Sequence, residues 1–263
     1  IHIDWDASSV ELSSGLVQVL GAEGPVRVLF GLSIPLVPGD TGVEMDLLVG
    51  LEDIQAAHRG KYIPYILSDK LRPWLAASIG EGMIEQGGFL WRGSLNPGAP
   101  ELHTVQLFFN IRDTALDYHP DWPPLANIAG TVLIDNAAAS VWADSASLLD
   151  SRVSKLSVEV WPDASGQLWL AVAGSVAGPA ADGLAVVNNS PLGGLVGGTF
   201  SDWRLAGELA TDIELLLNLT DKAIVPAVAV SARFAGAELD IQPGNLPLRG
   251  ISGVLDYDSE TGF

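Results

Sequence analysis

The sequence predicts a mainly β fold: an elongated antiparallel sheet curled into a groove, with about two short helices. Three observations lead to this prediction. Apolar and polar residues alternate along most of the chain, one stretch of sequence recurs 123 residues further on, and helical patterns are scarce. Alternation with a period of two residues is typical of a strand with one apolar face. A chain of 263 residues can bury a large core, so size does not limit the fold.

The recurring stretch reads LDYHPDWPPLANIAGTVLI at 116–134 and LDIQPGNLPLRGISGVLDY at 239–257. Seven of the nineteen positions are identical without a gap, where composition alone gives about one. Each copy contains the end of a strand, a link with prolines, and the start of the next strand. Recurrence favours a structure that grows by adding strands in one direction. A duplicated domain with matching turns would give the same pattern.

The first 60 residues contain two strand patterns, PVRVLFGLSI and GVEMDLLVGL, which have no place in the repeat. From Ser68 the chain reads SDKLRPWLAASIGEG, where apolar residues recur every fourth position, a proline falls in the first turn and glycines follow. This pattern predicts a short amphipathic helix. A second helix is predicted from about Ala180 to Asn188, ending before Pro191.

The strand patterns after residue 100 each present one apolar side. In LHTVQLFFNIR, for example, apolar residues alternate with polar ones, and Phe108 is the exception. Hairpin loops are expected between such runs, as at PDASGQ (162–167). The residues predicted to share the apolar face and to line the groove are Val105, Leu107, Phe109, Ile111, Val132, Ile134, Leu156, Val158, Val160, Leu168, Leu170, Val172, Ile213, Leu215, Leu217, Leu219, Val228 and Val230.

Two short helices cannot cover the apolar side of a dozen or more strands, so something else must do so. Three arrangements would serve: a second sheet forming a sandwich, closure into a barrel, or a trough whose interior is filled by an apolar ligand. The recurrence along the chain favours the elongated trough over a compact sandwich.

The composition excludes several classes of partner. The chain has 13 Lys and Arg against 32 Asp and Glu, a formal net charge of −19, which repels nucleic acids and anionic lipid headgroups. Only 17% of the residues are charged and the mean hydropathy is +0.30, yet no apolar run is long enough for a membrane-spanning helix. The chain has no cysteine, which excludes disulfides and thiolate metal sites. It begins at Ile1 without methionine, inside a strand pattern, and stops at Phe263 directly after another, so we expect a piece of a longer protein.

No pattern in the sequence indicates catalysis, a metal or a cofactor. Asp117 and Asp240 recur in the repeat, which argues against a single catalytic pair. The histidines lack the spacing of a metal site and are expected at surface or turn positions. They are His2, His58, His103 and His119. The sequence therefore predicts a protein that is not an enzyme.

Several segments, taken in order, resemble the AsmA-like proteins of Gram-negative bacteria, in particular their YhdP branch. The resemblance extends from about residue 60 to the end of the chain. It is carried by YIPYILSDKLRPWLAASIGEGMIEQGGFLWRGSL at 62–95, LFFNIRDTALDYHPDWPPLANIAGTVLIDN at 107–136, GPAADGLAVVNNSPLGG at 178–194 and the terminal LPLRGISGVLDYDSETGF.

The resemblance implies a repeating β-groove, or β-taco, that carries phospholipids between the inner and outer membranes. The protein would be periplasmic, anchored in the inner membrane through parts outside this sequence, and monomeric. Its partners would be phospholipid acyl chains and the two membranes, not nucleic acid. We expect N-terminal strands at 1–60, a first groove repeat at 61–177 and a truncated second repeat at 178–263. The alternatives are a scaffold or chaperone for outer-membrane protein assembly, and a hydrolase of envelope polysaccharide.

Overall fold

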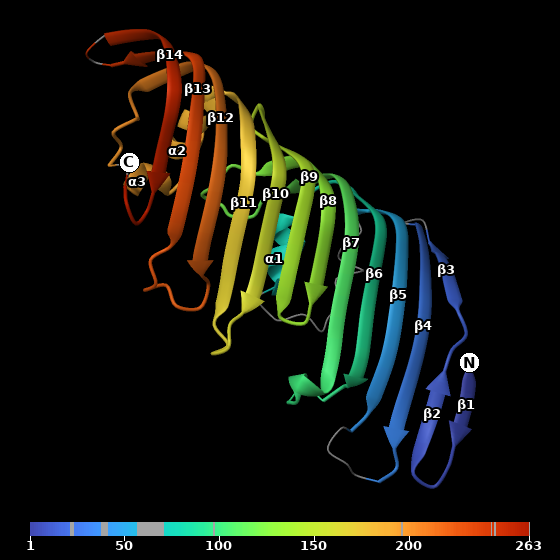
Figure 1. Ribbon diagram of the computed structural model, residues 1–263. Helices are drawn as coiled ribbons and strands as arrows, with labels where there is room; N and C mark the ends of the chain where they lie inside the picture. The colour runs from blue at the N-terminus through green and yellow to red at the C-terminus, as the bar shows by residue number, and fades with distance from the viewer. Residues whose placement is uncertain are drawn as a thin grey trace.

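The computed structural model describes residues 1–21, 24–37, 42–56, 71–96, 98–195, 197–242, 244 and 246–262. These residues form one 14-stranded antiparallel sheet that is open at both edges, which confirms the predicted class (Figure 1). Neighbouring strands follow one another in sequence order, except that β3 pairs with β4 beside β2. The strands are β1 (His2–Trp5), β2 (Ser9–Ser13), β3 (Val17–Gly21), β4 (Gly24–Pro35), β5 (Glu44–Gln55), β6 (Met83–Ser94), β7 (His103–Leu116), β8 (Leu125–Asp135), β9 (Ala138–Leu148), β10 (Ser151–Pro162), β11 (Leu168–Pro179), β12 (Trp203–Asn218), β13 (Ala227–Ile241) and β14 (Leu246–Asp258).

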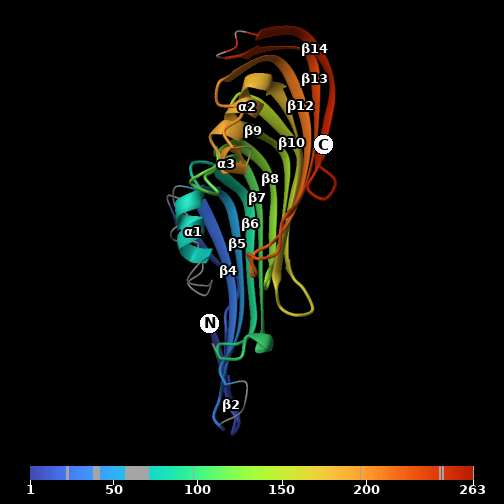
Figure 2. The same ribbon diagram turned by 90° about the vertical axis from the view of Figure 1, so that its left-hand side faces the viewer.

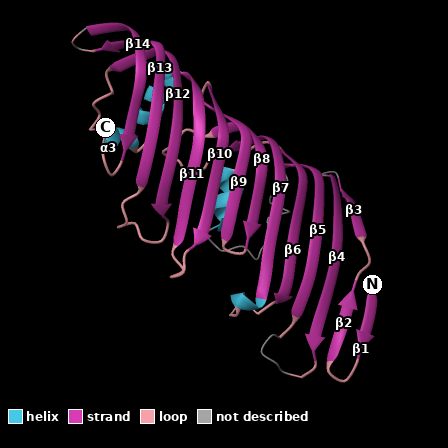
Figure 3. Cartoon of the chain, viewed as in Figure 1, coloured by secondary structure: helices cyan, strands magenta, loops and turns pink. Residues whose placement is uncertain are grey.

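The helices are few and short, as the sequence predicts (Figure 3). Those in the described ranges are α1 (Leu71–Ser78), α2 (Ala180–Asn188), α3 (Leu192–Leu195) and a 3₁₀ turn, η2 (Pro100–Leu102). The bounds of α2 coincide with the predicted second helix, and α1 lies within the stretch predicted from Ser68, of which residues 68–70 are outside the described part. Asp182 of α2 accepts hydrogen bonds from Ser151 Oγ at 2.7 Å and from the Asp150 backbone at 3.0 Å, so the helix is fixed to the start of β10.

The sheet is curved, and the helices α1, α2 and α3 lie on its concave side (Figure 2). A Cβ atom added at Gly183 of α2 would lie 2.5 Å from Leu209 Cδ2 of β12, so the Leu209 side chain points toward this side. In a strand, side chains two residues apart share a face. Paired residues in neighbouring strands also share a face. The strand register therefore extends the assignment of the concave side from Leu209 to the other strands.

A line of β-bulges crosses the sheet near the strand ends that curl. Asp53, Asp113, Asn127 and Lys155 have positive φ angles of 51–53° inside strands, beside shifts in the pairing register. Glycines with positive φ take this place further on, at Gly207, Gly236 and Gly250. A bulge bends its strand and increases the local twist. Bulges at one level in successive strands therefore curl that edge of the sheet.

The repeat found in the sequence is also a repeat of strand register. Asp113 and Gly236, 123 residues apart, both have positive φ, and so do Asn127 and Gly250. The β7–β8 and β13–β14 pairs show the same two register shifts. The equivalent pairings are Ile111–Gly130 with Phe234–Gly253, Thr114–Ile128 with Ala237–Ile251, and Leu116–Leu125 with Leu239–Leu248. The domain boundaries at 61 and 178 stay a prediction.

The most deeply buried cluster lies beside the bulges. Ile128, Ala143, Ala146 and Val153 are only 3–4% exposed. Partly buried residues pack against them: Ile111, Leu116, Leu125, Leu148, Leu156 and Val176. Small side chains in this cluster let the curled strands approach one another, so the protein itself fills the concave side at this end.

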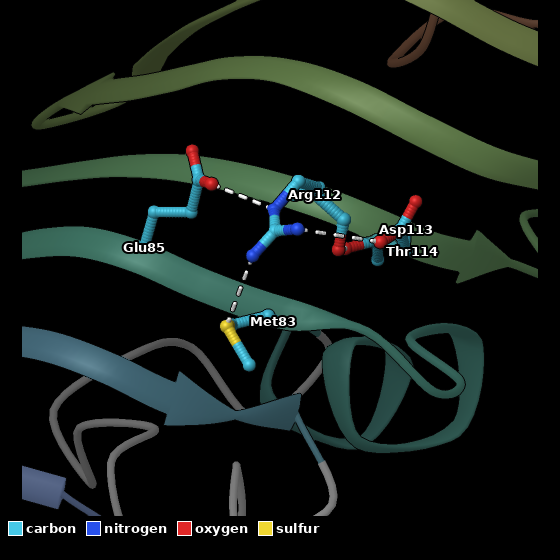
Figure 4. Close-up of polar contacts among 5 residues, drawn as sticks. All are labelled: Met83, Glu85, Arg112, Asp113 and Thr114. Carbon is cyan, nitrogen blue, oxygen red and sulfur yellow. Dashed lines mark hydrogen bonds and ion pairs between the residues drawn. The ribbon is translucent and has the colours of Figure 1, made fainter.

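On the opposite, convex side, Arg112 connects β6 to β7 at the bend (Figure 4). Its guanidinium lies 2.7 Å from Glu85 Oε1 and donates to Met83 Sδ at 3.6 Å, while its Nη1 atom lies 3.9 Å from Asp113 Oδ2. Thr114 Oγ1 donates to the Arg112 carbonyl at 3.2 Å. The charged side chains of this group are solvent-exposed, so their ion pairs orient the bulge more than they stabilise the fold.

Gly130 and Gly253 allow a matched test of the packing at the bend. A Cβ at Gly130 would lie 2.7 Å from Ala143 Cα and clash with the Trp142 carbonyl, whereas nothing lies within 4 Å of the equivalent Cβ at Gly253. We expect Gly130→Ala to lower the free energy of unfolding by about 1–3 kcal/mol, measured by urea denaturation. Gly253→Ala should change it by less than about 0.5 kcal/mol. Equal effects would show that the bend is not closely packed.

Candidate functional site

The central feature of the concave side is a row of directly paired residues that crosses eleven strands. Each member is the register partner of the next, from β3 to β13. The row consists of Val19, Val26, Leu51, Gly87, Phe109, Val132, Val141, Val158, Val172, Leu215 and Val228. None of these residues can donate or accept a side-chain hydrogen bond.

Two further rows flank the central one. Toward the end of the sheet with the 163–167 hairpin lie Val17, Val28, Val49, Phe89, Leu107, Ile134, Ala139, Val160, Leu170 and Leu217. Toward the curled end lie Ile54, Ile84, Ile111, Gly130, Ala143, Leu156, Gly174, Ile213, Val230 and Tyr257. We call these three rows the apolar face.

All eighteen residues that the sequence analysis selected lie on the concave side of the sheet. Fifteen belong to the three rows. The other three, Val105, Leu168 and Leu219, lie one step further toward the hairpin end: Val105 pairs with Trp91, Leu168 pairs with Pro162, and the Leu219 amide donates to the Leu168 carbonyl. Leu107 is 3% and Leu219 44% exposed, and the other sixteen are partly exposed. Contact with lipid remains a prediction for all of them.

The two sides of the sheet differ in charge. None of the residues in the three rows is Asp, Glu, Lys or Arg. The convex side carries cross-strand ion pairs: Arg27 with Glu52 at 3.0 Å, Arg92 with Asp46 at 2.8 Å and Arg233 with Asp212 at 2.6 Å. The three rows on the concave side thus offer a continuous hydrocarbon surface, whereas the convex side carries these ion pairs.

Comparison with known proteins agrees with this architecture. The family model described as YhdP protein matches residues 18–262, which is nearly the whole chain. The chain belongs to the YhdP protein family. The predicted resemblance to the YhdP branch is therefore confirmed.

A YhdP-family relative in Escherichia coli strain K12 bears the name intermembrane phospholipid transporter YhdP. It is 22% identical over 227 residues, which are 84% of this chain and 18% of the relative. The chain thus spans about a fifth of the length of this curated relative. No solved structure matches the chain.

In this YhdP-family sheet the sequence analysis missed the concave residues of the first six strands. Val49, Leu51 and Ile54 of β5 and Phe89 of β6 extend the same rows. The alternating pattern GVEMDLLVGL was the available signal. It indicated a strand, but no repeat copy assigned it to a face.

Trp91 and His103 place two side chains with polar nitrogen atoms at the hairpin end of the concave side. Their rings stack at a centroid distance of 4.2 Å and an angle of 20°. Trp91 is 2% exposed, and neither its Nε1 nor His103 Nδ1 has a hydrogen-bond partner. His103 begins β7 and is partly exposed, and its strand directs it onto the concave side. His58 lies outside the described residues.

Metal sites and membrane-spanning helices were also sought within the described ranges. No three His, Asp or Glu side chains gather there in a way that could hold a metal ion. None of the described helices has the length and hydropathy needed to cross a membrane.

The hairpin between β10 and β11 is held by one carboxylate. Asp163 accepts hydrogen bonds from Ser165 Oγ at 2.6 Å and from Trp169 Nε1 at 3.0 Å, besides the Ser165 and Gln167 backbone amides. These bonds favour the charged form and lower the pKa of Asp163 to about 2, the Ser165 hydroxyl having the largest effect. Similarly, hydrogen bonds from Ser175 and then Arg233 lower the pKa of Asp212.

The lowered pKa of Asp163 predicts an acid-sensitive hairpin. Because the folded pKa is below the unfolded value, this carboxylate stabilises the fold at pH values above about 4, and its contribution is lost as the pH falls toward about 2. We expect Trp169 fluorescence to report hairpin loosening within this window, while Asp163→Asn removes the transition. A transition that persists unchanged in Asp163→Asn would assign it to another group.

Proposed function

We propose that this chain is a segment of a bridge-like carrier that conducts phospholipids between the inner and outer membranes, with the acyl chains held against the apolar face. The observation that carries the proposal is the set of three uncharged rows that cross the sheet without interruption. The name of the E. coli relative, an intermembrane phospholipid transporter, supports the same cargo.

The apolar face suits the energetics of lipid transfer. A phospholipid exposes roughly 30 methylene groups, and at about 0.8 kcal/mol each their transfer into water costs on the order of 25 kcal/mol. Contact with a continuous hydrocarbon surface removes most of this cost. Partly exposed side chains, such as Val158 and Leu215, still have area that a lipid could cover.

The direction of the rows suits movement. They run across the strands, so at about 4.8 Å per strand the central row is roughly 50 Å long, more than the ~30 Å hydrocarbon core of a bilayer. A ligand that slides cannot be held by strong directional bonds, and the three rows offer almost none. Tyr257, at one end, carries their only polar side chain.

The proposed location, oligomeric state and repeat organisation are those that the resemblance to the YhdP family implies. The carrier would be periplasmic, monomeric and non-enzymatic, anchored in the inner membrane by parts outside this sequence. Repeats at 61–177 and 178–263 would each contribute strands to one groove, continued by the strands of 1–60. The matching bulges and registers of β7–β8 and β13–β14 support a repeat that extends the same surface.

The first test asks whether lipid contacts the concave side. We expect the chain purified from bacteria to release phospholipid on organic extraction, detected by mass spectrometry. Photo-crosslinking amino acids at Leu107, Val158 and Leu215 should capture phospholipid. The same group at Glu159 or Glu214, one residue away on the convex side, should not. Capture of unfolded outer-membrane proteins in place of lipid would favour the scaffold alternative.

The second test compares identical substitutions on opposite faces. Leu215→Arg places a charge within the central row, where burial without a partner is costly, and Leu216→Arg places it on the convex side. We expect Leu215→Arg to reduce the bound phospholipid per chain by about tenfold and Leu216→Arg to leave it near the wild-type amount. Both variants should be compared by circular dichroism to verify folding. Equal lipid content in the two variants would overturn the face assignment.

A further inference from the structure

The convex side of the sheet has an apolar patch that the lipid-carrying proposal does not use. Phe108, the exception to the alternation of its strand, belongs to it. Leu29, Leu48, Phe108, Leu133 and Trp142 are 38%, 49%, 38%, 39% and 44% exposed, and Leu90 is partly exposed. These six residues come from β4, β5, β6, β7, β8 and β9, on the face turned away from the helices in Figure 2. We call them the convex patch.

The register makes the patch continuous. Leu48 pairs directly with Leu29 on one side and with Leu90 on the other. Phe108 pairs directly with Leu133. Leu90 and Phe108 are diagonal neighbours, and so are Leu133 and Trp142, because each pair is offset by two positions from direct pairing. Aromatic and long side chains remain in contact range across such diagonals.

The patch is confined to one part of the convex side. Further along the sheet, the positions on this face between Trp142 and the carboxyl-terminal strands are mainly small or charged, for example Ser157, Ala173 and Glu214, which pair in one row. Six neighbouring large apolar side chains therefore form a local feature. On a protein surface a patch of this kind typically marks an interaction site.

The charges at the borders of the patch indicate which occupant fits. Arg92 is paired with Asp46 along one border and Arg27 with Glu52 along the other, so both cations are neutralised by the protein itself. Asp135, which accepts from Gln106 Nε2 at 3.3 Å, adds a carboxylate beside Leu133. Glu159 adds another in the row of Phe108 and Leu133. The border is therefore net negative.

We propose that the convex patch docks a protein segment whose apolar stripe is flanked by lysine and arginine residues. A second copy of this chain would bring two chains of net charge −19 together, and an anionic bilayer would repel the same surface. A basic amphipathic segment matches both the apolar area and the acidic border. Docking on the convex side leaves the apolar face free, so a partner and lipid could be held together.

The test uses a designed peptide as the probe. An 18-residue amphipathic helix with a leucine stripe flanked by lysines is titrated against the lipid-loaded chain by fluorescence anisotropy at physiological salt. We expect the double variant Phe108→Ser, Leu133→Ser to weaken binding by about tenfold. Leu216→Ser, on the convex side outside the patch, should leave the affinity unchanged. A companion peptide with glutamates in place of the lysines should bind weakly to every variant.

Three results would overturn the proposal: equal peptide affinity for the double variant and the wild type, patch-dependent self-association measured by sedimentation, or patch-dependent binding to phosphatidylglycerol-containing vesicles. The phospholipid content of each variant, measured in parallel, should match the wild type. A loss of peptide binding with normal lipid content therefore tests the convex patch separately from the lipid-carrying function.

Discussion

The structure depends on one constraint: a wide antiparallel sheet with a single apolar face must find something to cover that face. In a sandwich or a barrel the cover is another part of the sheet. Here the described helices are too few, and the strands continue side by side without closing. Within the described residues, protein covers the curled end most closely, where Ala143 and Ala146 approach Val153 in a buried cluster. Most of the remaining hydrocarbon surface stays partly exposed, and the proposal of an apolar guest rests on this exposure.

The line of bulges gives the sheet its curvature. Residues with positive φ, such as Asp113 and Asn127, let several strands bend at a similar level. Aspartate and asparagine tolerate the left-handed conformation better than most residues, and glycine replaces them at the equivalent positions Gly236 and Gly250. The backbone conformation is thus kept between the two copies while the side chain changes. Curvature, rather than any particular side chain, is what the repeat preserves at these positions.

The two sides of the sheet differ in their interactions: polar contacts lie on the convex side and apolar rows on the concave side. The convex side has ion pairs and hydrogen-bonded carboxylates, exemplified by Asp212 between Ser175 and Arg233. Individually these exposed pairs contribute little stability, yet together they keep an unusually apolar chain hydrated. The concave side has no charge in its three rows, so lipid sliding there would meet no strong electrostatic well. The convex patch stands apart from both, and its acidic border suggests a protein partner.

The sequence by itself determined which residues alternate and therefore which side chains share a face within each strand. Val158 and Glu159 were assigned to opposite sides for this reason, and the repeat indicated open-ended growth. The bounds of α2 also followed from local pattern. The tertiary structure decided how separate strands align, because pairing depends on contacts between distant segments. It placed the strands of residues 1–60 in the same sheet, stacked His103 on Trp91 and brought Phe108 beside Leu133. Periodicity is local, whereas register and curvature arise only when neighbouring strands pair and bulges act together.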